Sequence, residues 1–75
     1  MRDTANVRFR VTAKTFEGME FITERFPERQ AAEDYLNRLE SDDILSDIPA
    51  KSVILTMEEM YEGEWIVLQR RTVTV

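Results

Sequence analysis

Apolar and polar side chains alternate over residues 7–14, a pattern typical of a β-strand with one face on a core and the other in water. The apolar positions are Val7, Phe9, Val11 and Ala13, and the polar positions are Arg8, Arg10, Thr12 and Lys14. A turn over residues 16–19, which contains Gly18, leads into a returning strand over residues 20–25. This part of the chain therefore predicts a β-hairpin.

The length of this loop decides the register of the hairpin. A three-residue loop with Gly18 in the left-handed conformation places Lys14 opposite Glu20 and Arg10 opposite Glu24. A two-residue loop would set Arg10 against Arg25 and would require a positive φ at residue 17. We favour the three-residue loop, which points Phe21 toward the core and leaves Ile22 outward.

A helix is expected from Pro27 to about Glu40, because proline is tolerated at the first helical position, where its missing N–H would be unpaired. Its apolar residues recur at the spacing of a single helical stripe. They are Ala32, Tyr35, Leu36 and Leu39. This stripe would cover one face of a sheet.

A connector over residues 41–50 separates the helix from a second hairpin over residues 51–75, which turns at Glu62 and Gly63. Ile44, Leu45 and Ile48 of the connector are expected to fold over one end of the core. The sequence thus predicts an α+β fold of order ββαββ. Residues 1–75 would form a single small domain, a four-stranded antiparallel sheet with one helix packed on one face.

The second hairpin is apolar on both of its faces, and one helix can cover only one of them. With a two-residue turn, the uncovered face receives Ile54, Met60, Trp65 and Val67. With a three-residue loop, Ile66 and Leu68 turn outward instead. Either arrangement favours a partner-binding surface, because a contiguous exposed apolar patch usually marks an interface. A strongly coiled sheet, or cover from residues 44–48, is the alternative explanation.

Acidic residues gather on the helix, on the connector and around the second turn. The candidates for an acidic surface are Glu33, Asp34, Asp42, Asp43, Glu58 and Glu62. Such a surface either keeps a small protein in solution or steers it onto a basic protein. Calcium binding by residues 42–47 is not expected, because this segment lacks the glycine and the distal glutamate of a calcium-binding loop.

Basic residues are grouped on the first and last strands, and the candidates for a nucleic-acid surface are Arg8, Arg10, Lys14, Arg70 and Arg71. If those strands were neighbours, these side chains would form a basic stripe near an aromatic ring, as in platforms that bind single-stranded nucleic acid. Glu20 and Glu24 would partly neutralise that stripe. Nucleic-acid binding is therefore the alternative function.

The composition narrows the chemistry further. The chain has 75 residues, no Cys, no His, two glycines and a formal charge of −5. Without His or Cys the usual acid–base, nucleophilic and zinc chemistry is missing, and two isolated glycines cannot build a phosphate loop. We therefore expect no enzyme activity, cofactor or metal. The lack of a long apolar run or a signal peptide favours the cytoplasm and gives no reason to expect a membrane.

The expected function is therefore non-catalytic binding of a protein partner, which is either a second copy of the chain or a basic host protein. In size, acidity and lack of catalytic side chains the chain is similar to accessory proteins of phages and mobile elements, among them anti-CRISPR and other host-inhibitor proteins. This similarity is general and covers no motif. It implies a small inhibitor or adaptor, with no small-molecule substrate.

Overall fold

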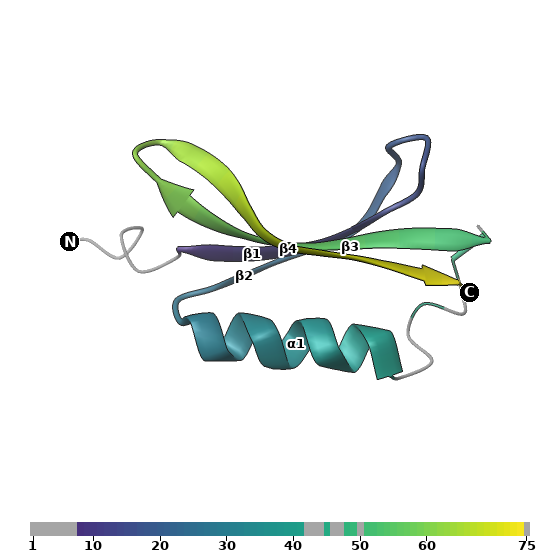
Figure 1. Cartoon of the computed structure of the whole chain (residues 1–75), viewed down its shortest axis with the longest axis horizontal. Helices are drawn as coiled ribbons and strands as arrows, with labels where there is room; N and C mark the ends of the chain where they lie inside the picture. The colour runs from purple at the N-terminus through teal and green to yellow at the C-terminus, as the bar shows by residue number, and fades with distance from the viewer. Residues whose placement is uncertain (1–7, 42–44, 46–47, 50, 75) are drawn as a thin grey trace.

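The computed structural model describes residues 8–41, 45, 48–49 and 51–74. The chain forms strand β1 (Phe9–Lys14), strand β2 (Glu20–Phe26), helix α1 (Arg29–Ser41), strand β3 (Ser52–Tyr61) and strand β4 (Glu64–Thr74) (Figure 1). The predicted order ββαββ is confirmed. A four-stranded antiparallel sheet carries α1 on one face, and the face without the helix is called the open face below.

The strand order is β2-β1-β3-β4, so β1 and β3 are central and β2 and β4 form the two edges. All three neighbouring pairs are antiparallel, which makes β2 and β3 parallel to each other with β1 inserted between them. Helix α1 therefore connects two parallel strands that do not touch. As a result, β1, which carries Arg10, and β4, which carries Arg70 and Arg71, are separated by β3.

The core lies between α1 and the two central strands. Ala32, Leu36 and Leu39 of the helix are fully buried. The sheet contributes the alternating apolar residues of its two central strands: Phe9, Val11, Ala13, Val53, Leu55 and Met57. Leu45 and Ile48 of the connector are also buried in this core, as expected, whereas Ile44 lies outside the described residues.

The helix begins two residues later than predicted. Glu28 is the last residue before it, because its carbonyl oxygen accepts the first helical hydrogen bond, from the Ala32 N–H at 3.3 Å. Pro27 therefore precedes the helix rather than opening it. Phe26 ends β2 with its ring centroid 5.3 Å from that of Tyr35, and this contact joins the strand to the first turns of α1. The 13 residues of α1 are too few to cross a bilayer, and no other helix in the described part of the chain could do so.

The first hairpin combines features of both registers that the sequence allows. Lys14 lies opposite Glu20 and Gly18 has a positive φ, as the three-residue loop predicts. A β-bulge then shifts the register, so that Ala13 lies opposite Ile22 and Arg10 opposite Arg25. The predicted orientation of the next two residues was therefore wrong: Ile22 packs against the core and Phe21 is exposed. The extra residue of a bulge reverses every side chain that follows it.

The second hairpin has the two-residue turn. Glu62 and Gly63 both have positive φ, at 50° and 82°, which is the type I′ arrangement that matches the twist of the strands. A second bulge occurs in β4, where Met57 lies opposite Gln69 and Glu58 opposite Val67, so that Leu68 is the extra residue. Bulges increase the local twist and bend a strand. In Figure 1 both hairpin ends rise away from α1, and the open face is concave.

Candidate functional site

The open face carries the four residues that the two-residue turn assigned to a partner-binding surface. Each of the four either pairs with a residue of this face or lies two positions along the strand from one. They are Ile54, Met60, Trp65 and Val67. Val67 is 45% exposed, whereas the other three are partly buried. The chain therefore covers part of this apolar surface itself, as the alternative of a strongly coiled sheet predicted.

Two arginines from strands β1 and β2 lie over the Trp65 ring on the open face. Its ring centroid lies 4.2 Å from the guanidinium carbon of Arg10 on β1 and 6.0 Å from that of Arg25 on β2. In a flat sheet β4 and β2 would be roughly 14 Å apart, three strand spacings. The bend of the second hairpin thus brings the indole across the open face. Arginine over an aromatic ring is a favourable cation–π arrangement.

Arg10 also forms a short ion pair, with its Nε 2.6 Å from Oε1 of Glu58 on the neighbouring strand. Both side chains are largely shielded from water, at 22% and 13% exposure. Beside them the hydroxyls of Thr12 and Thr56 are hydrogen-bonded across the same two strands. The centre of the open face is therefore a polar cluster in which these four side chains are paired with one another.

A groove of about 290 Å³ lies beside this cluster, between the β1–β2 loop and β4. Phe16, Ile54 and Val67 give it apolar walls. Lys14, Arg70 and Glu58 are its charged lining residues. The charge of Glu58 is already paired with Arg10, so the groove presents apolar surface next to cations.

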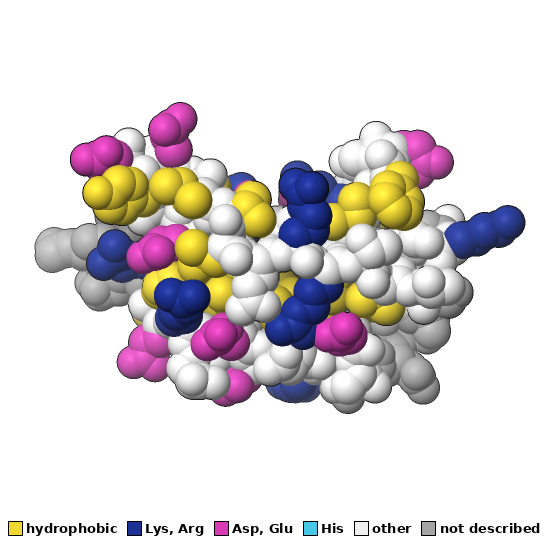
Figure 2. Space-filling model, in the orientation of Figure 1, with side chains coloured by type: hydrophobic (Ala, Val, Ile, Leu, Met, Phe, Trp, Pro, Cys, Tyr) yellow, Lys and Arg dark blue, Asp and Glu magenta, His cyan; other side chains and the backbone are white. Residues whose placement is uncertain are grey.

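The hairpin ends expose large hydrophobic side chains that the sequence analysis did not assign to a site. Phe16 and Met19 in the first loop are 68% and 61% exposed, and Tyr61 and Ile66 of the second hairpin are also exposed. Figure 2 shows hydrophobic side chains at both raised ends, with lysine or arginine side chains between them. The exposure of Phe16 and Met19 could have been inferred from the sequence, because both flank a turn, where apolar residues are unusual.

Charge on the open face is opposite in sign to that of the whole chain. Arg10, Lys14, Arg25 and Arg70 lie on it, against the carboxylates of Glu20 and Glu58. The Nζ atom of Lys14 is 3.9 Å from Oε1 of Glu20, and both side chains of this pair are exposed. Among the described residues, neither Arg25 nor Arg70 has a carboxylate within ion-pair distance. The face is therefore net positive on a protein whose formal charge is −5.

The five basic candidates do not form one stripe. Arg10, Lys14 and Arg70 lie on the open face, but Arg71 lies on the helix side, where its Nη1 donates to Oε1 of Glu40 at 2.6 Å and to Oδ1 of Asn37 at 2.9 Å. Adjacent residues of a strand face opposite sides, and the bulge at Leu68 decides which of these two lies on the open face, because an unbroken register would place Arg71 there instead of Arg70. Arg8, just before β1, lies 3.5 Å from a carboxylate oxygen of Glu59.

The acidic candidates are also dispersed. Glu33 and Asp34 lie on α1, where Glu33 accepts a hydrogen bond of 3.4 Å from Gln69 and Asp34 accepts one of 3.0 Å from Gln30. Glu62 is exposed in the second turn, at the far end of the sheet. Glu58 pairs with Arg10, as described above, and Asp42 and Asp43 lie outside the described residues.

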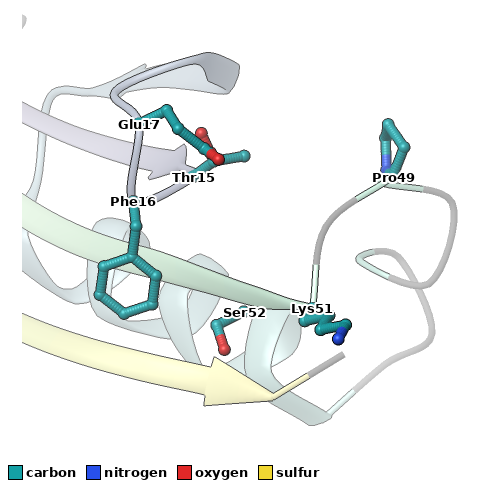
Figure 3. A pocket seen from close by; sticks show the side chains of 6 residues that line it. All are labelled: Thr15, Phe16, Glu17, Pro49, Lys51 and Ser52. Atoms are coloured by element: carbon teal, nitrogen blue, oxygen red, sulfur yellow. The ribbon is translucent and has the colours of Figure 1, made fainter.

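A second hollow, of about 250 Å³, lies on the other side of Phe16 (Figure 3). It is lined by Thr15, Phe16, Glu17, Pro49, Lys51 and Ser52. The Phe16 ring hangs from the loop toward β3, whereas Glu17 and Thr15 point away from it. Phe16 therefore divides the surface at this end of the sheet into two hollows.

Among the described residues, Tyr35 has a displaced pKa. Burial against the sheet raises the pKa of its hydroxyl above the ordinary value of 10.0, and the negative charge of Glu24 adds to this effect, while Arg38 opposes it. Tyr35 lies on the helix side, packed on Phe26, and lines neither hollow. The shift therefore reflects packing on the helix side of the sheet.

No family model matches the chain, and no curated protein or solved structure matches it.

Proposed function

We propose that this protein is a non-catalytic binding module that docks another protein against the open face of its sheet. The observation that carries this proposal is the combination of a concave, helix-free face with an exposed apolar residue, Val67, beside an arginine that has no carboxylate partner among the described residues, Arg70. Aromatic residues, methionine and arginine are enriched at protein interfaces, and this face offers all three.

Docking of a different protein fits the charge better than pairing of two copies through this face. In a symmetric dimer each patch meets its own copy, so the cations of one open face would lie against those of the other. Like charges brought together in this way cost free energy. An inhibitor or adaptor that occupies a partner's surface agrees with this geometry and stays a prediction.

Binding of single-stranded nucleic acid is the second candidate, since Arg10, Arg25 and Trp65 come together on the open face. Such binding requires an aromatic face that is free to stack on a base. One face of the Trp65 ring already carries Arg10 at 4.2 Å. The net charge of −5 also opposes association with a polyanion. These two features favour a protein partner.

Site-specific photo-cross-linking tests the proposal. Benzoylphenylalanine is placed at position 67 on the open face and, in a matched variant, at the exposed position 34 on α1. Both variants are expressed in the native host cells of the protein. We expect a defined protein adduct from position 67 only, identified by mass spectrometry and then reconstituted from purified components. Val67→Asp should weaken that reconstituted complex by about tenfold or more, because it replaces an apolar contact at the interface with a charged side chain.

Adducts from position 34 alone would assign binding to the acidic helix and contradict the proposal. Size-exclusion chromatography with light scattering measures the molar mass of the purified protein in solution. A stable dimer that Val67→Asp dissolves would show that the open face pairs with itself.

A further inference from the structure

We propose that the groove beside Arg70 receives an acidic segment of the partner protein, in which a carboxylate side chain accompanies an apolar one. This inference rests on the proposed function and adds the chemistry of the partner. Its basis is charge complementarity within a single groove of about 290 Å³, whose walls are apolar and whose unneutralised charges are positive.

The cations are available for such a segment. Arg70 is exposed, and no carboxylate of the described residues lies within ion-pair distance of it. Lys14 has an ion pair of 3.9 Å with Glu20, in which both side chains are exposed and solvent screens the attraction. A guanidinium can hold a carboxylate through two parallel hydrogen bonds, which gives geometric specificity as well as attraction.

The apolar walls give the second element of recognition. Phe16, Ile54 and Val67 line the same groove as the two cations, so one ligand segment would meet both. The volume of the groove is near the lower end for a ligand site, roughly 300 Å³. It therefore suits one or two side chains of a peptide rather than a large cofactor. In an extended segment, residues i and i+2 point the same way, so an acidic and an apolar residue at that spacing reach the groove together.

A second copy of the chain fits this groove poorly through its helix. The exposed residues of α1 include Gln30, Asp34 and Asn37, which carry charge or amides but no apolar side chain. The open face of a second copy is itself cationic. Neither of these two surfaces complements the groove, and the occupant inferred here is a segment of a different protein.

Three capped peptides that differ in one property each test the inference. The peptide SDSLSDSFS carries aspartate, leucine and phenylalanine at alternate positions, SKSLSKSFS reverses its charge, and SDSSSDSSS removes its apolar residues. Each is titrated into the full chain labelled with ¹⁵N, and the amide resonances and the fluorescence of the single tryptophan are followed. We expect SDSLSDSFS to shift the resonances of Phe16, Val67 and Arg70, with a Kd below about 1 mM.

The two control peptides should bind at least about tenfold more weakly, and added salt should weaken SDSLSDSFS. Arg70→Gln should reduce binding of SDSLSDSFS by about fivefold or more, a typical loss for one charged contact. Arg29→Gln, at the start of α1, is the matched control and should leave the affinity unchanged. Circular dichroism of both variants verifies that each is folded.

Equal affinity for SKSLSKSFS, or no binding of SDSLSDSFS at millimolar concentration, would overturn the inference that the groove binds an acidic segment. The proposed function would then still stand if position 67 forms its protein adduct. A twelve-residue oligothymidylate that shifts the same resonances when SDSLSDSFS does not would assign the groove to nucleic acid. A dimer that Arg70→Gln dissolves would identify a second copy as the occupant and would likewise overturn the inference.

Discussion

The guanidinium carbon of Arg10 lies 4.2 Å from the centroid of the Trp65 ring, although the two residues belong to strands that are not neighbours. The second hairpin bends far enough for its tryptophan to cross β3 and reach β1. This contact lies where the second hairpin curves over the open face (Figure 1). It also joins the two hairpins on the side of the sheet that α1 does not support.

The contact between Arg10 and Trp65 should be measurable as a coupling free energy. In a double-mutant cycle of Arg10→Met and Trp65→Leu, urea unfolding should give about 1 kcal/mol of coupling, as expected for a partly desolvated cation–π pair. The cycle of Arg70→Met with Trp65→Leu is the control, since no contact joins those side chains. It should be additive within about 0.5 kcal/mol. Equal coupling in both cycles would show that the effect is general electrostatics rather than the ring contact.

The second turn can be stabilised by one substitution. Glu62 has φ of 50°, a conformation that asparagine adopts more readily than glutamate, and Gly63 follows it in the type I′ turn. Glu62→Asn should raise the free energy of unfolding by about 0.5 kcal/mol, measured by urea denaturation. Glu62→Gln removes the same charge without easing the backbone and should leave the free energy of unfolding nearly unchanged. A similar gain in both variants would attribute the effect to charge.

The bulge at Leu68 can be removed without changing the strand pairs on either side of it. Deletion of Leu68 leaves Val67 opposite Glu58 and Gln69 opposite Met57 in an unbroken ladder. The hairpin should therefore remain paired but straighten, and the contact between Arg10 and Trp65 should be lost. Nuclear Overhauser effects between the indole and β1 would measure this loss.

Leu68→Ala keeps the extra residue and serves as the control for the lost side chain. Both variants should lose about 1–2 kcal/mol of stability, because Leu68 packs against the core. Only the deletion should abolish the Overhauser effects between Trp65 and β1. Their persistence in the deletion variant would show that the bulge does not cause the bend.

Tyr35 makes the free energy of unfolding depend on pH in the alkaline range. Its pKa is raised in the folded protein, so the folded state holds the phenolic proton more tightly than the unfolded chain does. The associated stability is complete below the unfolded value of about 10 and is lost as the pH rises through the folded pKa. In a Tyr61→Phe background, tyrosinate absorbance should titrate at a higher pH for the folded protein than in concentrated urea.

The contribution of Glu24 to this shift can be tested separately. Its negative charge raises the pKa of Tyr35, so Glu24→Gln should lower the folded titration midpoint toward its ordinary value. Glu28→Gln, at an exposed position before the helix, is a matched charge control and should have a smaller effect. An equal shift in both variants would point to net charge rather than to the proximity of Glu24.

The local sequence pattern predicted the positions of some residues correctly and of others wrongly. The stripe of Ala32, Leu36 and Leu39 predicted the helix and its buried face, because a helical period depends only on neighbours in the chain. Phe21 and Ile22 were assigned to the wrong faces, because the bulge beside them depends on how β2 meets β1. Val67 was assigned to the uncovered face only under a two-residue second turn, which is the turn that Glu62 and Gly63 form, whereas Phe16 was not assigned to a partner-binding surface.

The amino-acid pattern alone determined the order of elements, the position of the second turn and the surplus of apolar residues over what one helix can cover. Those properties follow from periodicity and backbone preference, which act over a few residues. The tertiary structure decided the strand order, the type of the second turn, the two bulges and the placement of Arg70 rather than Arg71 on the open face. These features depend on pairing between distant segments, where one extra residue exchanges the two faces of a strand at little local cost.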